Sequence, residues 1–458
     1  MLPRIEDLKV VLLDVIADRA ERGYEVAGFR ERVQAAPGSY DELAAIHRAL
    51  DAAPPRPDWP YVEPDDLEAI WAGCPDLPAD PLRPVDLDAA SRRAEAGFLG
   101  SVCGCVLGKP VEVRTDMEAL QRAAEAAGEW PIRDYLSEAL LDALGDRHRS
   151  WREAVRGRIR FVARDDDINY TVLGMLILER HGIGFSRGDV MQMWLTNLPL
   201  SYTFGPERML LTRASAVGIA ERLRQGRGLD GIGDDPEPVL AELVASWNPG
   251  DELCGAQIRA DAYGYACPGR PRLAATLAWR DAGWTHRGTG VYGAMFTAAA
   301  IAGAFVIDDP LELFRMALRC VPRRSRFHER VGDCLEQVAA ATDWHDGYRR
   351  IHDRYGCYGH CRIYQETGTL INTLRFADGV EDGICMQVSQ GNDTDSYGAT
   401  AGSLLGILHG RAPERRWLAP FNDEIRTTVA GLYESSLSKV AQRIGRLPQL
   451  VATQLAAR

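Results

Sequence analysis

Two short acidic segments, far apart in the chain, carry the side chains best suited to chemistry. The first is the aspartate run 165–167, and the second is the GNDTDS segment at 391–396. Each segment precedes an apolar stretch with helical spacing, so we expect each acid group at the start of a buried helix. Backbone N–H groups and the helix dipole favour negative charge there by about 0.3–1 kcal/mol. Gly391 permits a tight turn that lets the acids of the second segment converge.

If the two helix starts meet, their side chains form an all-oxygen ligand set. Carboxylate and hydroxyl oxygens are ligands for Mg²⁺, Mn²⁺ or Ca²⁺ rather than Zn²⁺ or copper. Five carboxylates exceed the need of one divalent ion, so we expect two Mg²⁺ ions, with Mn²⁺ as an alternative. The competing interpretation is that the aspartate run is only a solvated helix cap. The predicted metal ligands are Asp165, Asp166, Asp167, Asp393, Asp395 and Ser396.

The composition describes a large globular protein with a substantial core. The chain has 458 residues, 46% of them hydrophobic, and a net charge of −12 that argues against nucleic acid or an anionic membrane as a partner. Ten Cys residues are scattered along it and no signal peptide is recognisable, which favours free thiols and a cytoplasmic location.

The uncharged stretch 291–307 is at the lower length limit for a membrane span, and we expect a buried helix there.

The hydrophobic spacing predicts an all-α protein with two parts. Residues 1–85 are expected to form a small helical N-terminal extension with a Pro-rich linker, and residues 86–458 to form one large catalytic domain. The best candidate for a strand is the RIRFV segment, 158–162. The predicted helices of the large domain are 88–107, 114–128, 165–181, 187–197, 208–225, 237–246, 255–264, 271–282, 288–306, 310–319, 330–342, 344–354, 366–376, 394–409 and 422–444.

Three segments resemble the ADP-ribosylglycohydrolase family, which includes the dinitrogenase-reductase-activating glycohydrolases. The GSVCGCVLGKPVE segment at 100–112 is similar to the family's Gly-rich helix, which ends at Gly-x-Pro-x-Glu. The aspartates at 165–167 match the family's Thr-Asp-Asp, and the segment at 391–396 matches its Gly-Gly-Asp-Thr-Asp-Thr. The resemblance extends from about residue 90 to about residue 440 in the same order and spacing.

The resemblance implies a large orthogonal multi-helix fold, two Mg²⁺ ions and cleavage of a glycosidic bond at C1 of an ADP-linked ribose. The ions would bind ribose hydroxyls and a water, while a carboxyl group acts as general acid or base. The candidates for this catalytic carboxyl are Glu112, by its position in the motif, and Asp166. The expected substrate is an ADP-ribosylated protein or a small ADP-ribosyl or ribosyl compound, with no membrane or nucleic-acid partner.

Three positions depart from the family motifs and leave other functions open. Cys105 stands where an acidic residue is frequent, Asp165 replaces Thr, and Ile168 follows the acid pair where Thr is common. The alternatives are a hydrolase of a simpler nucleoside or sugar N-glycoside, and a non-catalytic ADP-ribose-binding protein. A terpene-synthase-like lyase also uses two acidic motifs, but its second motif expects an acid where Thr400 stands.

Several further residues are candidates for substrate contact or metal binding. His286 is either a substrate-orienting residue or a packing residue, and Arg259 beside Asp261 favours an internal ion pair over substrate contact. The segment 357–361 has two Cys and a His, but it lacks the second pair of ligands that a structural Zn²⁺ site needs. The predicted substrate-binding residues are His286, Arg259, Tyr202 and Gly391.

Overall fold

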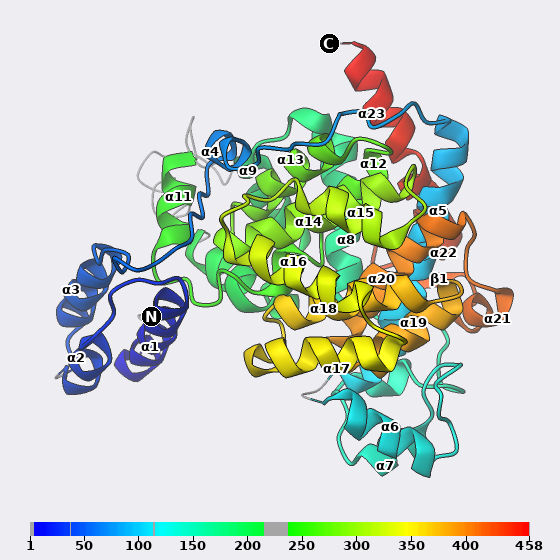
Figure 1. Cartoon of the computed structure of the whole chain (residues 1–458), viewed down its shortest axis with the longest axis horizontal. Coiled ribbons are helices and arrows are strands. Elements are labelled where there is room, and N and C mark those ends of the chain that lie inside the picture. Colours follow the sequence, from blue (N-terminus) through cyan, green and yellow to red (C-terminus); the bar gives the residue numbers. More distant parts are fainter. Residues whose placement is uncertain (1–3, 37, 113–114, 215–236, 458) are drawn as a thin grey trace.

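Helices form almost all of the regular structure (Figure 1). The computed structural model describes residues 4–36, 38–112, 115–214 and 237–457. Within these residues the one sheet has two short strands, β1 (Glu424–Arg426) and β2 (Glu434–Ser436), which pair antiparallel with Ile425 opposite Ser435. The prediction of an all-α fold is therefore confirmed.

The helices fall into an N-terminal group and a large bundle. The N-terminal group contains α1 (Ile5–Glu21), α2 (Phe29–Ala35) and α3 (Tyr40–Asp51), while α4 (Leu67–Ala72) packs on the bundle, where its Ile70 joins the large hydrophobic core. The bundle contains α5 (Leu87–Gly108), α6 (Met117–Ala126), α7 (Glu138–Leu144), α8 (Asp166–His181), α9 (Arg187–Asn197), α11 (Glu237–Ala245), α12 (Asp261–Ala266), α13 (Pro271–Ala282), α14 (Gly288–Ala304), α15 (Pro310–Leu318), α16 (Arg326–Ala339), α17 (Trp344–Tyr355), α18 (Tyr364–Phe376), α19 (Val380–Ser389), α20 (Thr394–His409), α21 (Arg415–Leu418), α22 (Leu437–Gly445) and α23 (Leu447–Ala456). Short 3₁₀ helices are η1 (Lys109–Val111), η2 (Trp151–Glu153), η3 (Gly182–Gly184), η4 (Leu200–Tyr202), η5 (Cys254–Ala256), η6 (Gly356–Tyr358) and η7 (Ala419–Phe421).

Helix α14 lies in the centre of the bundle and is buried at every position. Its small residues let α12 and α13 pack closely against it, which explains why an uncharged stretch of this length lies inside the protein. The expectation of a buried helix is confirmed for this segment. Among the helices in the described part of the chain, none is both long and apolar enough to cross a membrane.

Helices α5 and α20 run antiparallel and touch through their backbones. A side chain at Gly104 would overlap the carbonyl oxygen of Gly398, and one at Gly100 would overlap that of Gly402. At the end of this contact, the Thr394 hydroxyl donates a 2.9 Å hydrogen bond to the carbonyl oxygen of Gly108. The glycines therefore hold the last turn of α5 against the first turn of α20.

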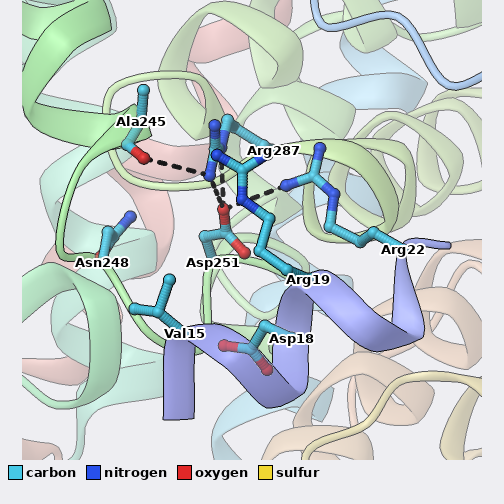
Figure 2. Close-up of a pocket in the computed structure, with 8 residues that line it drawn as sticks. All are labelled: Val15, Asp18, Arg19, Arg22, Ala245, Asn248, Asp251 and Arg287. Atoms are coloured by element: carbon cyan, nitrogen blue, oxygen red, sulfur yellow. Dashed lines mark hydrogen bonds and ion pairs between the residues drawn. The ribbon is translucent and has the colours of Figure 1, made fainter. Parts of the chain in front are cut away.

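The N-terminal group has its own small hydrophobic core and lies at one edge of the bundle (Figure 1). Helix α1 contacts the bundle through charged side chains: Gly250 N donates to Asp18 Oδ2 at 2.7 Å, and Arg22 Nη1 donates to Asp251 Oδ2 at 3.2 Å. Arg287 also binds Asp251, so this carboxylate lies between two guanidinium groups (Figure 2). The extension thereby holds the loop that precedes η5. The small hydrophobic core of the N-terminal group is formed by Leu12, Val15, Ile16, Val33, Ala36, Leu43, Ile46 and Leu50.

One predicted element at the C-terminal side is wrong. The single helix expected at 422–444 is instead the β1–β2 hairpin followed by α22. Asn422 and Asp423 adopt positive φ angles of 52° and 56°, which no helix accommodates. Asp423 then accepts hydrogen bonds from Ser436 and Ser438, and these bonds fix the start of α22 only at Leu437.

Three other predicted elements differ from the structure. The strand expected at 158–162 is wrong, because only Val162 pairs, in an isolated bridge with Ile425. The helix expected at 255–264 is divided into η5 and α12. The helix expected at 208–225 is helical through residue 214, and its remainder lies outside the described residues.

The backbone contact between α5 and α20 gives a stability prediction. We expect Gly104→Ala to lower the free energy of unfolding by about 1–3 kcal/mol or more, because the new methyl group overpacks a backbone contact. Gly332 is the matched control: it lies within α16, and an added Cβ there meets only the Leu318 side chain at 3.7 Å. Gly332→Ala should be neutral or gain up to about 1 kcal/mol from helix propensity.

Urea denaturation of both variants, followed by circular dichroism, measures this difference. Equal stability of Gly104→Ala and the wild-type protein would show that the helices do not need this close approach.

Candidate active site

Three segments from distant parts of the sequence converge on one cavity. The end of α5 and η1 supply Lys109 and Glu112, while the starts of α8 and α20 supply the two acidic segments, 165–167 and 393–396. The Ser396 hydroxyl lies 3.4 Å from Asp167 Oδ2, so the two helix starts are in direct contact. The structure thus brings together the segments that hold all six predicted metal ligands.

Lys109 lies inside the acid cluster, a position that the sequence motif did not reveal. Its Nζ atom is 2.7 Å from Asp165 Oδ2, 3.0 Å from Asp395 Oδ2 and 2.9 Å from Glu112 Oε2. Burial raises the pKa of Asp395, but Lys109 and the hydrogen bonds from Glu112 and Lys109 outweigh this effect and hold the pKa at about 2. Among the described residues, Lys109 is the only lysine or arginine within ion-pair distance of this cluster.

The remaining aspartates of the cluster have no ion pair with a lysine or arginine of the residues that the structure describes. Burial raises the pKa of Asp166 and of Asp167 well above the ordinary value, and repulsion from Asp165 is the second largest cause of this shift. Burial and the nearby Asp395 raise the pKa of Asp393 to about 7. Asp167 Oδ1 is buried and has no hydrogen-bond partner in the described part of the chain. Unpaired carboxylate oxygens with a deficit of positive charge fit a hard divalent cation.

Glu112 is placed to hold a proton at the edge of the cluster. Its carboxyl group lines the cavity, and its Oε2 atom is 3.7 Å from His148 Nδ1. Burial raises the pKa of Glu112 to about 10, and the negative charge of Asp395 is the second largest cause of this shift. The side chain is therefore protonated at neutral pH in the metal-free protein, and a protonated carboxyl group in a cavity can act as a general acid.

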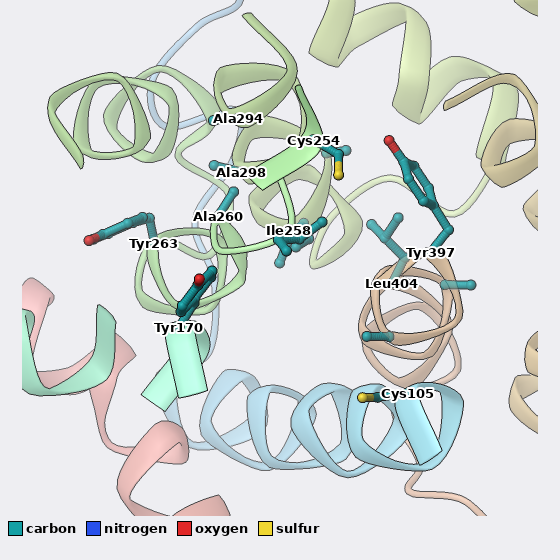
Figure 3. Packing of buried hydrophobic residues seen from close by; sticks show 14 of the residues in the cluster. Cys105, Tyr170, Cys254, Ile258, Ala260, Tyr263, Ala294, Ala298, Tyr397 and Leu404 are labelled. Atoms are coloured by element: carbon teal, nitrogen blue, oxygen red, sulfur yellow. The ribbon is translucent and has the colours of Figure 1, made fainter. Parts of the chain in front are cut away.

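The cavity has a volume of about 240 Å³ and combines the polar cluster with an apolar wall. Tyr170, Cys254 and Ile258 form part of this wall: Tyr170 comes from α8, and Cys254 and Ile258 come from the segment that begins at η5 (Figure 3). Pockets for drug-sized ligands begin at about 300 Å³. This cavity therefore has space for a sugar-sized part of a larger ligand.

Two of the predicted substrate-binding residues are buried beside the cavity and do not line it. Arg259 is an internal ion pair as interpreted, but its partners are Glu207 at 2.5 Å and Asp281 at 2.6 Å rather than Asp261. His286 Nε2 lies 3.7 Å from Glu207 Oε1. Of these residues, only Glu207 lines the cavity. Arg259 and His286 therefore influence the cavity only through their contacts with Glu207.

The other two predicted substrate-binding residues lie elsewhere. Tyr202 is exposed and does not line the cavity. Gly391 has a φ of 77° and packs against the backbone of Thr115 and Asp116, where a side chain would clash. It therefore shapes the turn that precedes Asp393, as the sequence indicated, and does not line the cavity.

Thiol groups occupy positions in this site that the sequence did not connect. Cys105 is buried, and its sulfur lies within 4.8 Å of ligand atoms of Asp165 and Asp167. Cys254 and Cys361 are 107 positions apart in the chain, yet both lie next to Asp393 and line the cavity. Neither spacing nor periodicity could have predicted that pair, because η5 and the loop before α18 meet only through the tertiary fold.

The comparison with protein families agrees with this geometry. A family model described as ADP-ribosylglycohydrolase matches residues 86–447, which include the end of α5 and the starts of α8 and α20. A comparison with curated proteins found no match. The matched span begins at Asp86, the residue that caps α5, and it contains every residue of the acid cluster. The chain therefore belongs to the ADP-ribosylglycohydrolase family.

Proposed function

We propose that this protein is a metal-dependent glycohydrolase that cleaves the glycosidic bond at C1 of an ADP-ribosyl or related ribosyl group. Membership of the family supports hydrolysis of an ADP-ribose linkage. The observation that carries the proposal is the convergence of Glu112 and a buried acid cluster on one sugar-sized cavity.

The acid cluster is proposed to hold Mg²⁺ or Mn²⁺. When bound, such an ion would orient the ribose hydroxyls and lower the pKa of a bound water. Asp167 and Ser396 join the two helix starts at 3.4 Å, and the unpartnered Oδ1 atom of Asp167 offers a free lone pair. The proposed ligands of this Mg²⁺ or Mn²⁺ ion are Asp165, Asp166, Asp167, Asp395 and Ser396. Asp393, the sixth ligand predicted from the sequence, also lies beside donor atoms of Cys254, Cys361, Glu112 and His360.

Glu112 and Asp166 are the proposed acid and base. Glu112 holds its proton at a carboxyl oxygen that faces the cavity, so it can protonate the leaving group as the bond at C1 breaks. Once Glu112 has given up this proton, the Lys109 ammonium 2.9 Å away stabilises the carboxylate that remains. Asp166 also lines the cavity, where its carboxylate can accept a proton from the attacking water.

The substrate is proposed to be an ADP-ribosylated protein or a small ADP-ribosyl compound whose ribose enters the cavity. A volume of about 240 Å³ admits the sugar and leaves the rest of such a ligand outside. The same volume also favours a second candidate function, hydrolysis of a simpler nucleoside or sugar N-glycoside.

A product screen tests the reaction class and the metal requirement together. We expect the wild-type protein with Mg²⁺ to release ADP-ribose or ribose from at least one of ADP-ribosyl-arginine, ADP-ribosyl-serine, O-acetyl-ADP-ribose and nucleosides. EDTA should abolish release, and added Mg²⁺ or Mn²⁺ should restore it. Calorimetry should show Asp167→Asn with at least about 10-fold weaker Mg²⁺ binding and a matching loss of turnover, because it removes a charged ligand.

Asp309→Asn is the matched control for this screen. Asp309 caps α15 by accepting a hydrogen bond from Glu312 N, far from the acid cluster, and Asn serves equally well as a cap. It should retain metal affinity and turnover. Normal Mg²⁺ binding without hydrolysis of any substrate would contradict the proposed activity and favour a binding protein.

The role of Glu112 gives a separate kinetic prediction. We expect Glu112→Gln to lower kcat by about 10²–10⁴-fold, because the amide has no acidic proton, while Mg²⁺ affinity remains close to that of the wild type. The wild-type kcat/KM should fall as the pH rises through the pKa of Glu112 in the metal-bound enzyme, since only the protonated form donates. Steady-state pH profiles of both proteins measure this. A Glu112→Gln variant with wild-type kcat would exclude this residue as the acid.

A further inference from the structure

We propose that Cys254, His360, Cys361 and Asp393 form a binding site for a thiophilic divalent metal ion such as Zn²⁺ at the rim of the cavity. This site goes beyond the proposed glycohydrolase activity, which relies on oxygen ligands at the adjacent helix starts. The sequence offered the segment 357–361 as one half of a zinc site, and two of its residues, His360 and Cys361, belong to the site proposed here. The fold supplies the second half, because η5 places Cys254 beside that pair.

The distances between the donor atoms match a tetrahedral metal site. Asp393 Oδ2 lies 3.2 Å from Cys254 Sγ and 3.6 Å from Cys361 Sγ. Zinc bonds of about 2.3 Å to sulfur and about 2.0 Å to oxygen, at a tetrahedral angle, separate the two donor atoms by about 3.5 Å. The three ligand atoms all lie within 4.8 Å of one another, so one ion can contact all of them.

His360 is the nearest candidate for the fourth ligand: it lies beside Asp393 rather than within the group of the two sulfurs, so its ring would have to turn toward them. A ring nitrogen of His360 lies within 4.8 Å of the carboxylate oxygens of Asp393 and Glu112. The Nδ1 atom of His360 is buried and forms no hydrogen bond in the described part of the chain. Buried ring nitrogens are normally paired, and a coordinated metal would satisfy this one.

The backbone around these ligands is held in an unusual conformation. Gly359, Cys361 and Ile363 have φ angles of 74°, 61° and 66°, in the left-handed region that favours glycine. Glu366 fixes this loop by accepting hydrogen bonds from the backbone N–H groups of Cys361 at 2.8 Å and Ile363 at 3.1 Å. Strained backbone persists where the surrounding structure over-determines it, typically at ligand sites.

A second backbone contact joins the two sulfur-bearing segments. Cys254 N donates a 3.1 Å hydrogen bond to the carbonyl oxygen of Cys361, yet both thiols are free rather than joined in a disulfide. The N-terminal extension supports the same pair, since Asp18 of α1 binds both Gly250 N, in the loop before η5, and Arg362, which follows Cys361. The ligands are therefore held in place before any ion binds.

The donors select the metal. Thiolate and imidazole ligands favour Zn²⁺ over Mg²⁺, while the carboxylates of the adjacent cluster favour Mg²⁺. Binding would displace the protons of both thiols to solvent, giving two thiolates and one carboxylate around the ion, and the His360 imidazole would complete the set once its ring turns toward the sulfurs. Cys254, His360, Cys361 and Asp393 all line the cavity, so a bound ion would be open to a ligand from that side.

Cobalt titration of the full-length protein tests this site directly. The protein is reduced, stripped of metal with a chelator and titrated with Co²⁺, whose bonds to thiolate give a charge-transfer band in the near ultraviolet. We expect the band to saturate at one Co²⁺ per chain, to disappear on addition of Zn²⁺, and to be lost in Cys254→Ser and Cys361→Ser. His360→Ala should weaken Co²⁺ binding.

Two variants serve as controls and separate this site from the proposed activity. Cys357→Ser removes an exposed thiol four positions from Cys361 and should keep the band. Asp167→Asn alters the oxygen ligands and should keep it too, even though Mg²⁺ binding is weakened. A failed product screen with an intact cobalt band would reject the glycohydrolase activity alone.

The proposal is overturned if the reduced wild-type protein gives no charge-transfer band. It is also overturned if the band survives in both Ser variants. If a Ser variant does not fold, alkylation of the wild-type protein decides: Zn²⁺ must protect Cys361 but leave Cys357 reactive, as read by peptide mass spectrometry.

Discussion

The whole site depends on the backbone contact between α5 and α20. Glycines at 100 and 104 face glycines at 402 and 398, and nothing larger fits between the two helices. Because the helices are antiparallel, the C-terminal end of α5 meets the N-terminal start of α20. The dipoles of these two ends favour a cation and an anion respectively, and Lys109 and Asp395 supply them. Close helix packing thus places opposite charges together at a buried point.

The electrostatic balance of the site follows from this arrangement. Burying charges costs free energy unless they are paired, and Lys109 pairs with the carboxylates of Asp165 and Asp395. The pKa of Asp395 is accordingly depressed, while burial raises the pKa values of Asp166 and Asp167. One lysine cannot neutralise this many carboxylates, which explains why a bound metal ion would stabilise the fold as well as serve the proposed reaction.

Much of this arrangement follows from local sequence, and the rest from tertiary contacts. Helical spacing predicted α9, α13 and α20 with their observed boundaries, and the acid groups at helix starts followed from the preference of carboxylates for N-termini. Local patterns could not show that Lys109 enters the cluster or that Cys254 meets Cys361, because those contacts join segments far apart in the chain. The β1–β2 hairpin was missed because its turn residues interrupt an otherwise helical hydrophobic spacing.

The central claim is that the starts of α8 and α20 form one metal centre beside Lys109 and Glu112. Anomalous X-ray diffraction from crystals grown with Mn²⁺ tests it most directly, because the signal locates the ion without relying on activity. The account predicts an anomalous peak bonded to carboxylate oxygens from both helix starts, including Asp167 and Asp395. A well-ordered cluster without manganese, or manganese bound only outside these two segments, would contradict it.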